Sequence, residues 1–213
     1  MDIPVWLSKY LSREDTELIE GAVERAEKLT MGEIVPMVVK SSSTTNHVFL
    51  SLAFFMLSLY LLLFLFFVEE RGAFFQGGVF IAFVLLLFFL EKKLWVQRIL
   101  TPARDRAFQV EQRAVKEFYQ HRVNRTEKST GILIFVSLFE HQVVVLGDRA
   151  ISSKIPKAEW DGLVKVLVQG IKKRRMGQGF VEAIQICGGL LEAHFPKEDT
   201  NPNELSNHLV IKT

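Results

Sequence analysis

The sequence predicts an α/β domain that is interrupted by a two-helix transmembrane hairpin. Two uncharged apolar runs, Val48 to Val68 and Ala73 to Leu90, are separated by only four residues. Outside these runs, short apolar stretches of strand length alternate with segments whose apolar residues recur at helical spacing. The paired runs are typical of a membrane hairpin, and the alternation is typical of an α/β domain.

The first uncharged run has about the length that a helix needs to cross a hydrocarbon core of roughly 30 Å. The four residues between the runs cannot cross back through a bilayer, so the two helices should be antiparallel neighbours. The alternative is a pair of buried helices in a water-soluble core. That alternative requires a protein large enough to surround both helices, and the remaining chain is too small. We therefore expect a transmembrane hairpin.

Basic residues flank the hairpin unevenly. Lys92, Lys93 and Arg98 follow the second run and Lys40 precedes the first, whereas the connecting loop has Arg71 alone, beside two glutamates. By the positive-inside rule, both termini should be cytoplasmic. The net charge of +2 argues against general nucleic-acid binding.

Before the hairpin, we expect one helix and one strand. Ser12 and Asp15 have the spacing of a capping box, and the helix that follows should end near Gly32. Glu33 to Lys40 is apolar and β-branched and should form a buried strand, with Pro36 placing it at an edge or a bulge.

After the hairpin, the pattern predicts three helices and two strands. The helices should cover Arg104 to His121, Lys157 to Ile171 and Phe180 to His194. The strands, Gly131 to Leu138 and Gln142 to Leu146, are too close together for a helical crossover and should form an antiparallel pair.

The strand before the hairpin needs partners, because residues 1–47 are too few to form a domain. The simplest solution places it in one sheet with the two later strands. The hairpin, 48–90, is then an insertion into a single domain made of 1–47 and 91–196, and 197–213 is a polar C-terminal tail.

Several of these segments resemble the TPM domain, and in particular its membrane-embedded bacterial branch. The resemblance lies in EIVPMVVK, in RTEKSTGILIFVSLFEHQVVVLGDRAI from Arg125 to Ile151, in Trp160, in GQGFVEAIQICGGLLEAHFP from Gly177 to Pro196 and in the following NPNELSNHLV. It covers nearly all of the chain outside the hairpin, and the block TGILIFVSL…VVVLGD is its most specific part.

The resemblance implies an α/β/α sandwich with a small mixed sheet, in an integral protein of the bacterial cytoplasmic (inner) membrane. TPM relatives include metal-binding acid phosphatases and accessory subunits. The bacterial membrane-type relatives resemble companions of LemA-type membrane proteins. The resemblance therefore implies either an interaction module or a phosphatase.

A divalent cation is the first candidate ligand. Asp148 follows a predicted strand, where its carboxylate could bind calcium or magnesium through oxygen. Glu140 in the strand turn and Glu33 at the start of the first strand could join Asp148 only if the sheet brings these ends together. The alternative is that Asp148 belongs to a turn and Glu140 is a solvated loop residue.

Two polar segments outside the strands are further candidates. Arg125, Thr126 and Thr130 lie in a loop before the central strand that could hold a phosphate or a partner, or be only a loop. Lys172, Lys173, Arg174 and Arg175 form a basic run that could meet anionic lipid, or be a solvated helix end whose charges offset the helix dipole.

We therefore carry two hypotheses for function. The first is a membrane-anchored TPM-type module that docks a membrane protein partner or a second copy of itself in a cell-envelope role. The second is a divalent-metal-dependent phosphohydrolase with its site around Asp148.

Overall fold

A computed structural model describes residues 3–43, 46–67, 72–91, 96, 101–198 and 203–213. The chain forms two compact units, one made of Met1–Ser42 with Ala107–Thr213 and the other of Ser43–Arg106. The larger unit is assembled from segments on both sides of residues 48–90.

The larger unit contains a four-stranded mixed sheet in the order β3-β2-β1-β4. Strand β1 (Glu33–Val39) is parallel to β2 (Gly131–Ser137), which is antiparallel to β3 (Gln142–Gly147). Strand β4 (Val210–Lys212) adds to the other side of β1, in parallel. The predicted strand pair and the predicted joining of the first strand to it are therefore both confirmed.

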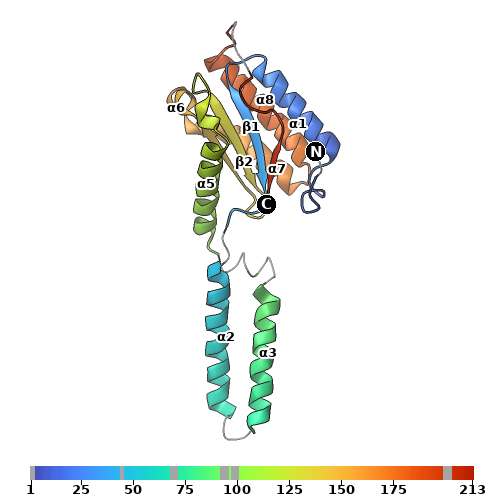
Figure 1. Ribbon diagram of the computed structural model, residues 1–213, viewed down its shortest axis with the longest axis vertical. Coiled ribbons are helices and arrows are strands. Elements are labelled where there is room, and N and C mark those ends of the chain that lie inside the picture. Colours follow the sequence, from blue (N-terminus) through green and yellow to red (C-terminus); the bar gives the residue numbers. More distant parts are fainter. Residues whose placement is uncertain (1–2, 44–45, 68–71, 92–95, 97–100, 199–202) are drawn as a thin grey trace. The chain divides into compact units, whose positions relative to one another are not determined.

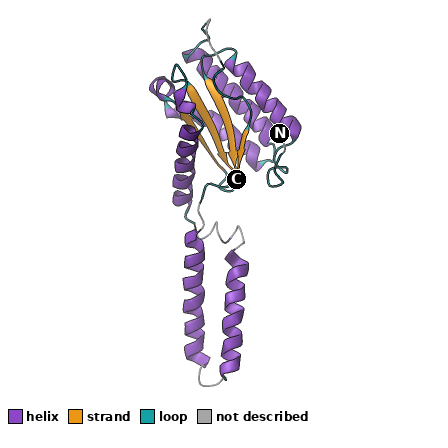
Figure 2. Ribbon diagram, viewed as in Figure 1, coloured by secondary structure: helices purple, strands orange, loops and turns teal. Residues whose placement is uncertain are grey.

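Helices cover both faces of this sheet, as Figures 1 and 2 show. On one face lie α1 (Arg13–Glu27), α7 (Asp161–Lys172) and α8 (Met176–His194), and on the other lies α5 (Ala103–Gln120). The side chains of β1 alternate between the two cores, with Ile34 and Val38 facing α1 and α8 and Val35 and Met37 facing α5. The expected α/β/α arrangement is thus present in this unit.

Local signals explain where several elements begin. The Ser12 hydroxyl accepts a hydrogen bond from the Asp15 amide at 3.1 Å, and the Asp15 carboxylate accepts one from the Ser12 amide at 2.8 Å, so the predicted capping box starts α1. The predicted helix at 157–171 is a short 3-10 turn, η2 (Lys157–Trp160), followed by α7. Another 3-10 turn, η1 (Val123–Arg125), interrupts the predicted loop before β2.

Two expectations about the edges of the fold need correction. The segment 197–213 is not only a polar tail, because Val210–Lys212 forms β4 and completes the sheet. Pro36 lies in an inner strand. However, β4 pairs only with Met37 to Val39, so no described strand lies beside Pro36 on that side of β1. The missing amide hydrogen of proline is tolerated there because no ladder bond is needed on that side.

The smaller unit contains α2 (Asn46–Phe67) and α3 (Ala73–Glu91), which lie side by side. Tyr60 of α2 packs edge-on against Phe80 and Phe83 of α3, with ring centroids 5.2 and 6.1 Å apart. The connecting residues Glu69, Glu70 and Arg71 lie outside the described part of the chain. The predicted pairing of the two helices is confirmed.

Membrane crossing is a separate question from helix pairing. Within the residues whose side chains are described, which cover 49–65 of α2 and 75–90 of α3, no helix is long and apolar enough to cross a membrane. The transmembrane character of the hairpin therefore stays a prediction.

Candidate functional site

Buried carboxylates mark three places in the larger unit. Glu27 and Glu33 lie at the end of the sheet where β1 begins, Glu140 lies at the opposite end, and Glu117 is a buried residue of α5. Each has an exposed fraction of 8 % or less, which is rare for glutamate unless it is paired.

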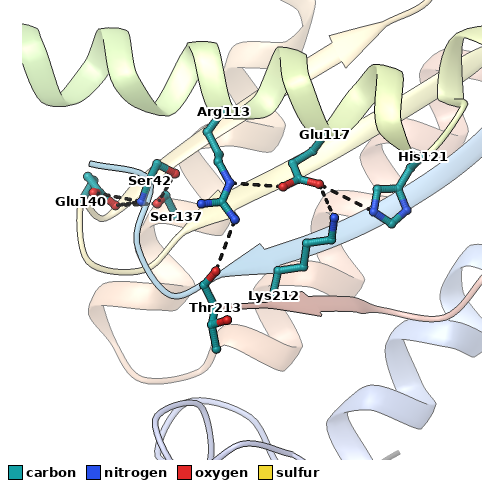
Figure 3. A network of polar contacts seen from close by, with 8 residues as sticks. All are labelled: Ser42, Arg113, Glu117, His121, Ser137, Glu140, Lys212 and Thr213. Carbon is teal, nitrogen blue, oxygen red and sulfur yellow. Dashed lines mark hydrogen bonds and ion pairs between the residues drawn. The ribbon is translucent and has the colours of Figure 1, made fainter. Parts of the chain in front are cut away.

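Glu117 is the centre of a charged network between α5 and β4 (Figure 3). Its carboxylate accepts hydrogen bonds from Lys212 Nζ at 2.5 Å and from Arg113 Nε at 3.1 Å, and His121 Nε2 lies 3.7 Å away. Arg113 also donates to the carbonyl of Thr213. Burial alone would raise the pKa of Glu117, but the two cations outweigh it and hold that pKa below its usual value.

The same network lowers the pKa of His121, through burial and then the charge of Lys212. One carboxylate thus faces two permanent cations and a largely neutral imidazole. The side chains of Arg113, Glu117, His121 and Lys212 thus interact with one another. The network fastens the three-residue strand β4 to α5.

Glu140 organises the point at which the chain leaves β1 (Figure 3). Its carboxylate accepts hydrogen bonds from the Ser41 hydroxyl at 3.1 Å, from the Ser42 amide at 3.2 Å and from the Ser137 hydroxyl. The hydroxyls of Ser42 and Ser137 are 2.8 Å apart. Glu140 is therefore neither solvated nor close to the end of the sheet that carries Asp148.

Asp148 and Glu33, by contrast, do lie at the same end of the sheet. The amide of Asp148 donates to the carbonyl of Gly131 at 2.8 Å, and Gly131 is paired with Glu33 in the β1–β2 register. Asp148 caps α6 (Arg149–Lys154), since its Oδ1 accepts from the Arg149 amide at 2.7 Å. Its other oxygen, Oδ2, is buried without a described hydrogen-bond partner, and so is Oδ1 of Asn124 in η1.

Glu27 and Glu33 form a second acidic feature at this end. Oε1 of Glu27 accepts from the Ile34 amide at 2.8 Å, and Oε2 of Glu33 accepts from the Leu205 amide at 3.1 Å. Oε2 of Glu27 is buried and makes no described hydrogen bond. These groups border a cavity of about 200 Å³, whose other lining residues are Glu24, Lys28, Lys197, Asn203 and Asn207.

Burial is the main cause of the raised pKa values of Glu27 and Glu33. It raises the pKa of Glu27 to about 8, with the neighbouring charge of Glu33 adding to the effect and the Ile34 amide opposing it. Burial likewise raises the pKa of Glu33. Glu27 is therefore mostly protonated at neutral pH.

A metal centre built from several acidic or sulfur ligands is not found in the described part of the chain. No group of three or more His, Cys, Asp or Glu side chains there is placed to hold a metal ion. The structure brings Glu33 and Asp148 to one end, and it leaves Glu140 at the other.

The loop before β2 turns most of its hydroxyls inward. Thr126 Oγ1 accepts from the Thr130 amide at 2.9 Å, and the Thr130 hydroxyl donates to the carbonyl of Met31 at 2.6 Å. Both threonines are buried, whereas Arg125 is exposed. Thr126 thus braces the loop internally, and Thr130 joins it to the chain that enters β1. Of the three candidate residues of this loop, Arg125 alone is exposed.

The basic run is exposed at every position from Lys172 to Arg175, in the turn between α7 and α8. The other candidate membrane-surface residues, Lys92, Lys93 and Arg98, lie outside the described part of the chain. Cys187, the only cysteine, is fully buried on α8, and burial raises the pKa of its thiol far above the ordinary value.

Comparison with known proteins identifies part of the chain. Residues 95–189 match the family model of the TPM domain. A solved structure, the NMR structure of the BA42 protein from the psychrophilic bacterium Bizionia argentinensis, superposes with a TM-score of 0.60 at 20% identity, covering 95% of each chain. At that identity the likeness concerns the fold alone. No curated protein matches the chain.

These findings confirm the resemblance to the TPM domain, but neither supports an assignment to its membrane-embedded branch. The match begins at residue 95, so β1 lies outside it even though β1 is an inner strand of the sheet.

Proposed function

We propose that this chain, in which residues 95–189 match the TPM domain, is a membrane-anchored interaction module. In this proposal the hairpin of α2 and α3 is inserted in the cytoplasmic membrane of a bacterium. The α/β unit lies on the cytoplasmic side and docks a membrane protein partner or a second copy of the chain, in a cell-envelope role.

One observation carries the proposal, namely the uncovered apolar surface of the smaller unit. Large apolar side chains along α2 and α3 are exposed, among them Phe54 at 76 % and Leu65 at 73 %. No Asp, Glu, Lys, Arg or His occurs between Val48 and Val68 or between Ala73 and Leu90. Burying apolar surface is worth about 25 cal/mol per Å², so such helices require an apolar covering. Lipid supplies one, and helices satisfy their own backbone there.

The absence of intramembrane charges also favours anchoring over transport, because ion and proton pathways usually contain at least one ionisable residue. A methyl group added at Gly78 would meet no described atom within 4 Å. Small residues permit close approach of helices, so this side of α3 is available to a helix of a partner.

Insertion can be tested with single cysteines, because the native Cys187 is buried and unreactive. Leu57→Cys places a thiol on an exposed position of α2, and Glu159→Cys places one on the exposed surface of the α/β unit. In native membranes, we expect a water-soluble maleimide to modify the Glu159→Cys variant and to leave the Leu57→Cys variant unmodified. Equal modification of both thiols would contradict insertion.

The same Glu159→Cys variant tests the topology. In intact cells, a membrane-impermeant maleimide should leave it unmodified, and lysis should make it reactive. Modification in intact cells would place the α/β unit outside the cytoplasm.

A second candidate function is a divalent-metal-dependent phosphohydrolase. It is favoured by two buried oxygen atoms near Gly131 that have no described hydrogen-bond donor. Asp148 Oδ2 and Asn124 Oδ1 are buried acceptors without described donors, and such oxygens are the ligands that calcium and magnesium prefer. Exposed Arg125 could contribute positive charge toward a phosphoryl group.

Asp148→Asn separates metal binding from the capping role of this residue, since asparagine and aspartate cap helices about equally well. We expect millimolar calcium or magnesium to raise the melting temperature of the native protein and not that of the variant. Asp161→Asn, at the exposed start of α7, should behave like the native protein. If neither ion shifts the melting temperature of the native protein, the phosphohydrolase candidate loses its support.

A further inference from the structure

The larger unit has two distinct ends, which the sheet defines. The first end is where β1 ends, and the second is where β1 begins and β3 ends. The two points at which the chain enters and leaves this unit both lie at the first end. Ser42 follows β1 and is held there by Glu140. Helix α5 runs from Ala107 toward η1, which packs on the start of β2, so Ala107 also lies at the first end.

The basic turn Lys172 to Arg175 lies at this same end. Helix α1 ends beside the start of β1, where Glu27 meets Ile34, so α1 begins at the first end of the unit. Gly177, at the start of α8, lies against Asp15 in the first turn of α1. The turn that joins α7 to α8 is therefore next to the beginning of α1 and carries four exposed cations.

The N-terminal segment adds apolar and aromatic groups to the first end. Residues 3–11 lead directly into the Ser12 cap of α1, and Leu7 and Leu11 are buried in the core. Val5 projects from this segment with 90 % of its surface exposed. Trp6 and Tyr10 are half-buried beside it, and Lys9 lies 5.2 Å from the centre of the Tyr10 ring.

The exposed charge at the first end is mostly positive. Lys9, Lys40 and the basic turn are exposed there, and Lys40 follows β1 directly. Of the nearby acids, Asp15 is held by Ser12 and Glu140 is buried among serines, while Glu14 is exposed. The second end contains the buried pair Glu27 and Glu33 and also exposed cations, among them Lys28 and Lys197 beside the cavity.

We propose that the first end of the α/β unit rests on the anionic surface of the lipid bilayer, with Val5 inserted among the headgroups and the basic turn against lipid phosphates. This inference rests on the proposed membrane hairpin and adds a second, peripheral contact to it. Clusters of lysine and arginine beside a membrane segment bind anionic lipid, and tryptophan and tyrosine favour the headgroup region.

The contact has a functional consequence. It would fix the orientation of the unit, so that the second end, with Asp148, Glu33 and the cavity beside Glu27, is turned away from the lipid. That end would be the one offered to a soluble partner or substrate.

The test uses the full chain in lipid nanodiscs, with a polarity-sensitive fluorophore on one introduced cysteine. Three variants are compared, namely Val5→Cys at the first end, Glu159→Cys as the matched exposed control at the second end, and Leu57→Cys in α2. The lipid is phosphatidylglycerol and phosphatidylcholine in equal amounts, with a fraction of lipid that carries a spin-label quencher in the headgroup region or, in a parallel sample, deep on the acyl chain. We expect the headgroup label to quench at Val5, the acyl-chain label to quench at Leu57, which lies midway along α2, and neither label to quench at Glu159.

A charge variant separates electrostatic contact from accidental proximity. Lys172 and Lys173 are exposed, and Lys172→Glu with Lys173→Glu should abolish most of the quenching at Val5 and leave quenching at Leu57 unchanged. Replacing the anionic lipid by phosphatidylcholine should have the same effect, since each cation near an anionic surface changes the binding constant about five-fold.

Three results would overturn the inference. Quenching at Leu57 without quenching at Val5 would mean that the hairpin is inserted but the unit does not rest on the lipid. Equal quenching at Val5 and Glu159, or quenching at Val5 that ignores both lipid charge and the charge variant, would exclude an oriented electrostatic contact. Absence of quenching at Leu57 would instead refute the membrane hairpin, and this inference would fall with it.

Discussion

Glu27→Gln should make the protein more stable than the native form at pH 9 and leave it about equally stable at pH 5. The native carboxyl has a pKa raised from an ordinary value of 4.5 to about 8, first by burial and then by the charge of Glu33. Each pKa unit corresponds to about 1.4 kcal/mol, so the fully ionised side chain costs the fold a few kcal/mol. Glutamine retains the carbonyl oxygen that accepts from the Ile34 amide and cannot ionise.

The direction of this effect follows from proton binding. Below pH 4.5 the carboxyl is protonated in both the folded and the unfolded chain, and it contributes no pH dependence. Between about 4.5 and 8 the folded protein keeps the proton that the unfolded chain has lost, so native stability falls as pH rises. Above about 8 the full cost is present. Glu33, whose pKa is also raised, contributes with the same sign.

Urea denaturation of the full chain in a mild detergent, followed by tryptophan fluorescence, to which the buried Trp160 contributes, measures this difference. Glu24→Gln is the matched control on the same helix face, one turn earlier. The pKa of Glu24 is lowered by its hydrogen bond and charge interaction with Lys28, so this control should show no gain at alkaline pH. A stability difference between Glu27→Gln and the native protein that is the same at pH 5 and pH 9 would contradict the assignment.

The elements with strong local signals were predictable from the sequence. The capping box of Ser12 and Asp15, the strand pair β2–β3 and the membership of β1 in the same sheet all depend on neighbouring residues or on the need to bury an apolar strand. The same reasoning identified the paired helices α2 and α3, because four residues leave no other connection.

Strand β4 was not predictable because three residues carry too little pattern. Leu209 to Ile211 is an isolated apolar patch in a polar segment, and it becomes a strand only because β1 has a free side there and Glu117 holds Lys212. Helix α6 was missed for a related reason. It has six residues, and its cap, Asp148, suggested a metal ligand rather than a helix start.

The candidate site was predictable only in part. The sequence does not determine the strand directions, and these directions place Glu33 and Asp148 at one end of the sheet and Glu140 at the other. Glu27 and Glu117 were missed, although a signal for each exists. Glu27 continues the spacing of buried Ile19 and Val23, and Glu117 adjoins buried Phe118. A carboxylate on an apolar helix face indicates a buried partner or a raised pKa.

Gly131→Ala should be the most damaging small substitution in the chain, with a loss of about 3 kcal/mol or more of unfolding free energy. A methyl group at this position would lie 1.9 Å from the carbonyl oxygen of Val123 and 2.9 Å from its carbonyl carbon. These are backbone atoms of the buried residue Val123 in η1, and they cannot rotate away. Relief requires moving either η1 or the first residue of β2.

Moving the first residue of β2 would disturb the candidate site directly. The carbonyl of Gly131 accepts from the Asp148 amide, and the residue is paired with Glu33 in the sheet. We therefore expect Gly131→Ala to weaken any metal-dependent stabilisation at Asp148 as well as the fold. Addition of calcium or magnesium should raise the melting temperature of this variant less than that of the native protein.

Gly189→Ala is the matched control for the same chemical change. Gly189 lies on the exposed side of α8, where an added methyl group meets no described atom within 4 Å. Alanine is favoured over glycine in a helix interior by up to about 1 kcal/mol, so this variant should be slightly more stable than the native protein. Urea denaturation at pH 7 measures both variants against the native chain. A Gly131→Ala variant within 1 kcal/mol of the native protein, about the accuracy expected of such a measurement, would show that η1 can move away from β2 and that the close approach at Gly131 is not required for the fold.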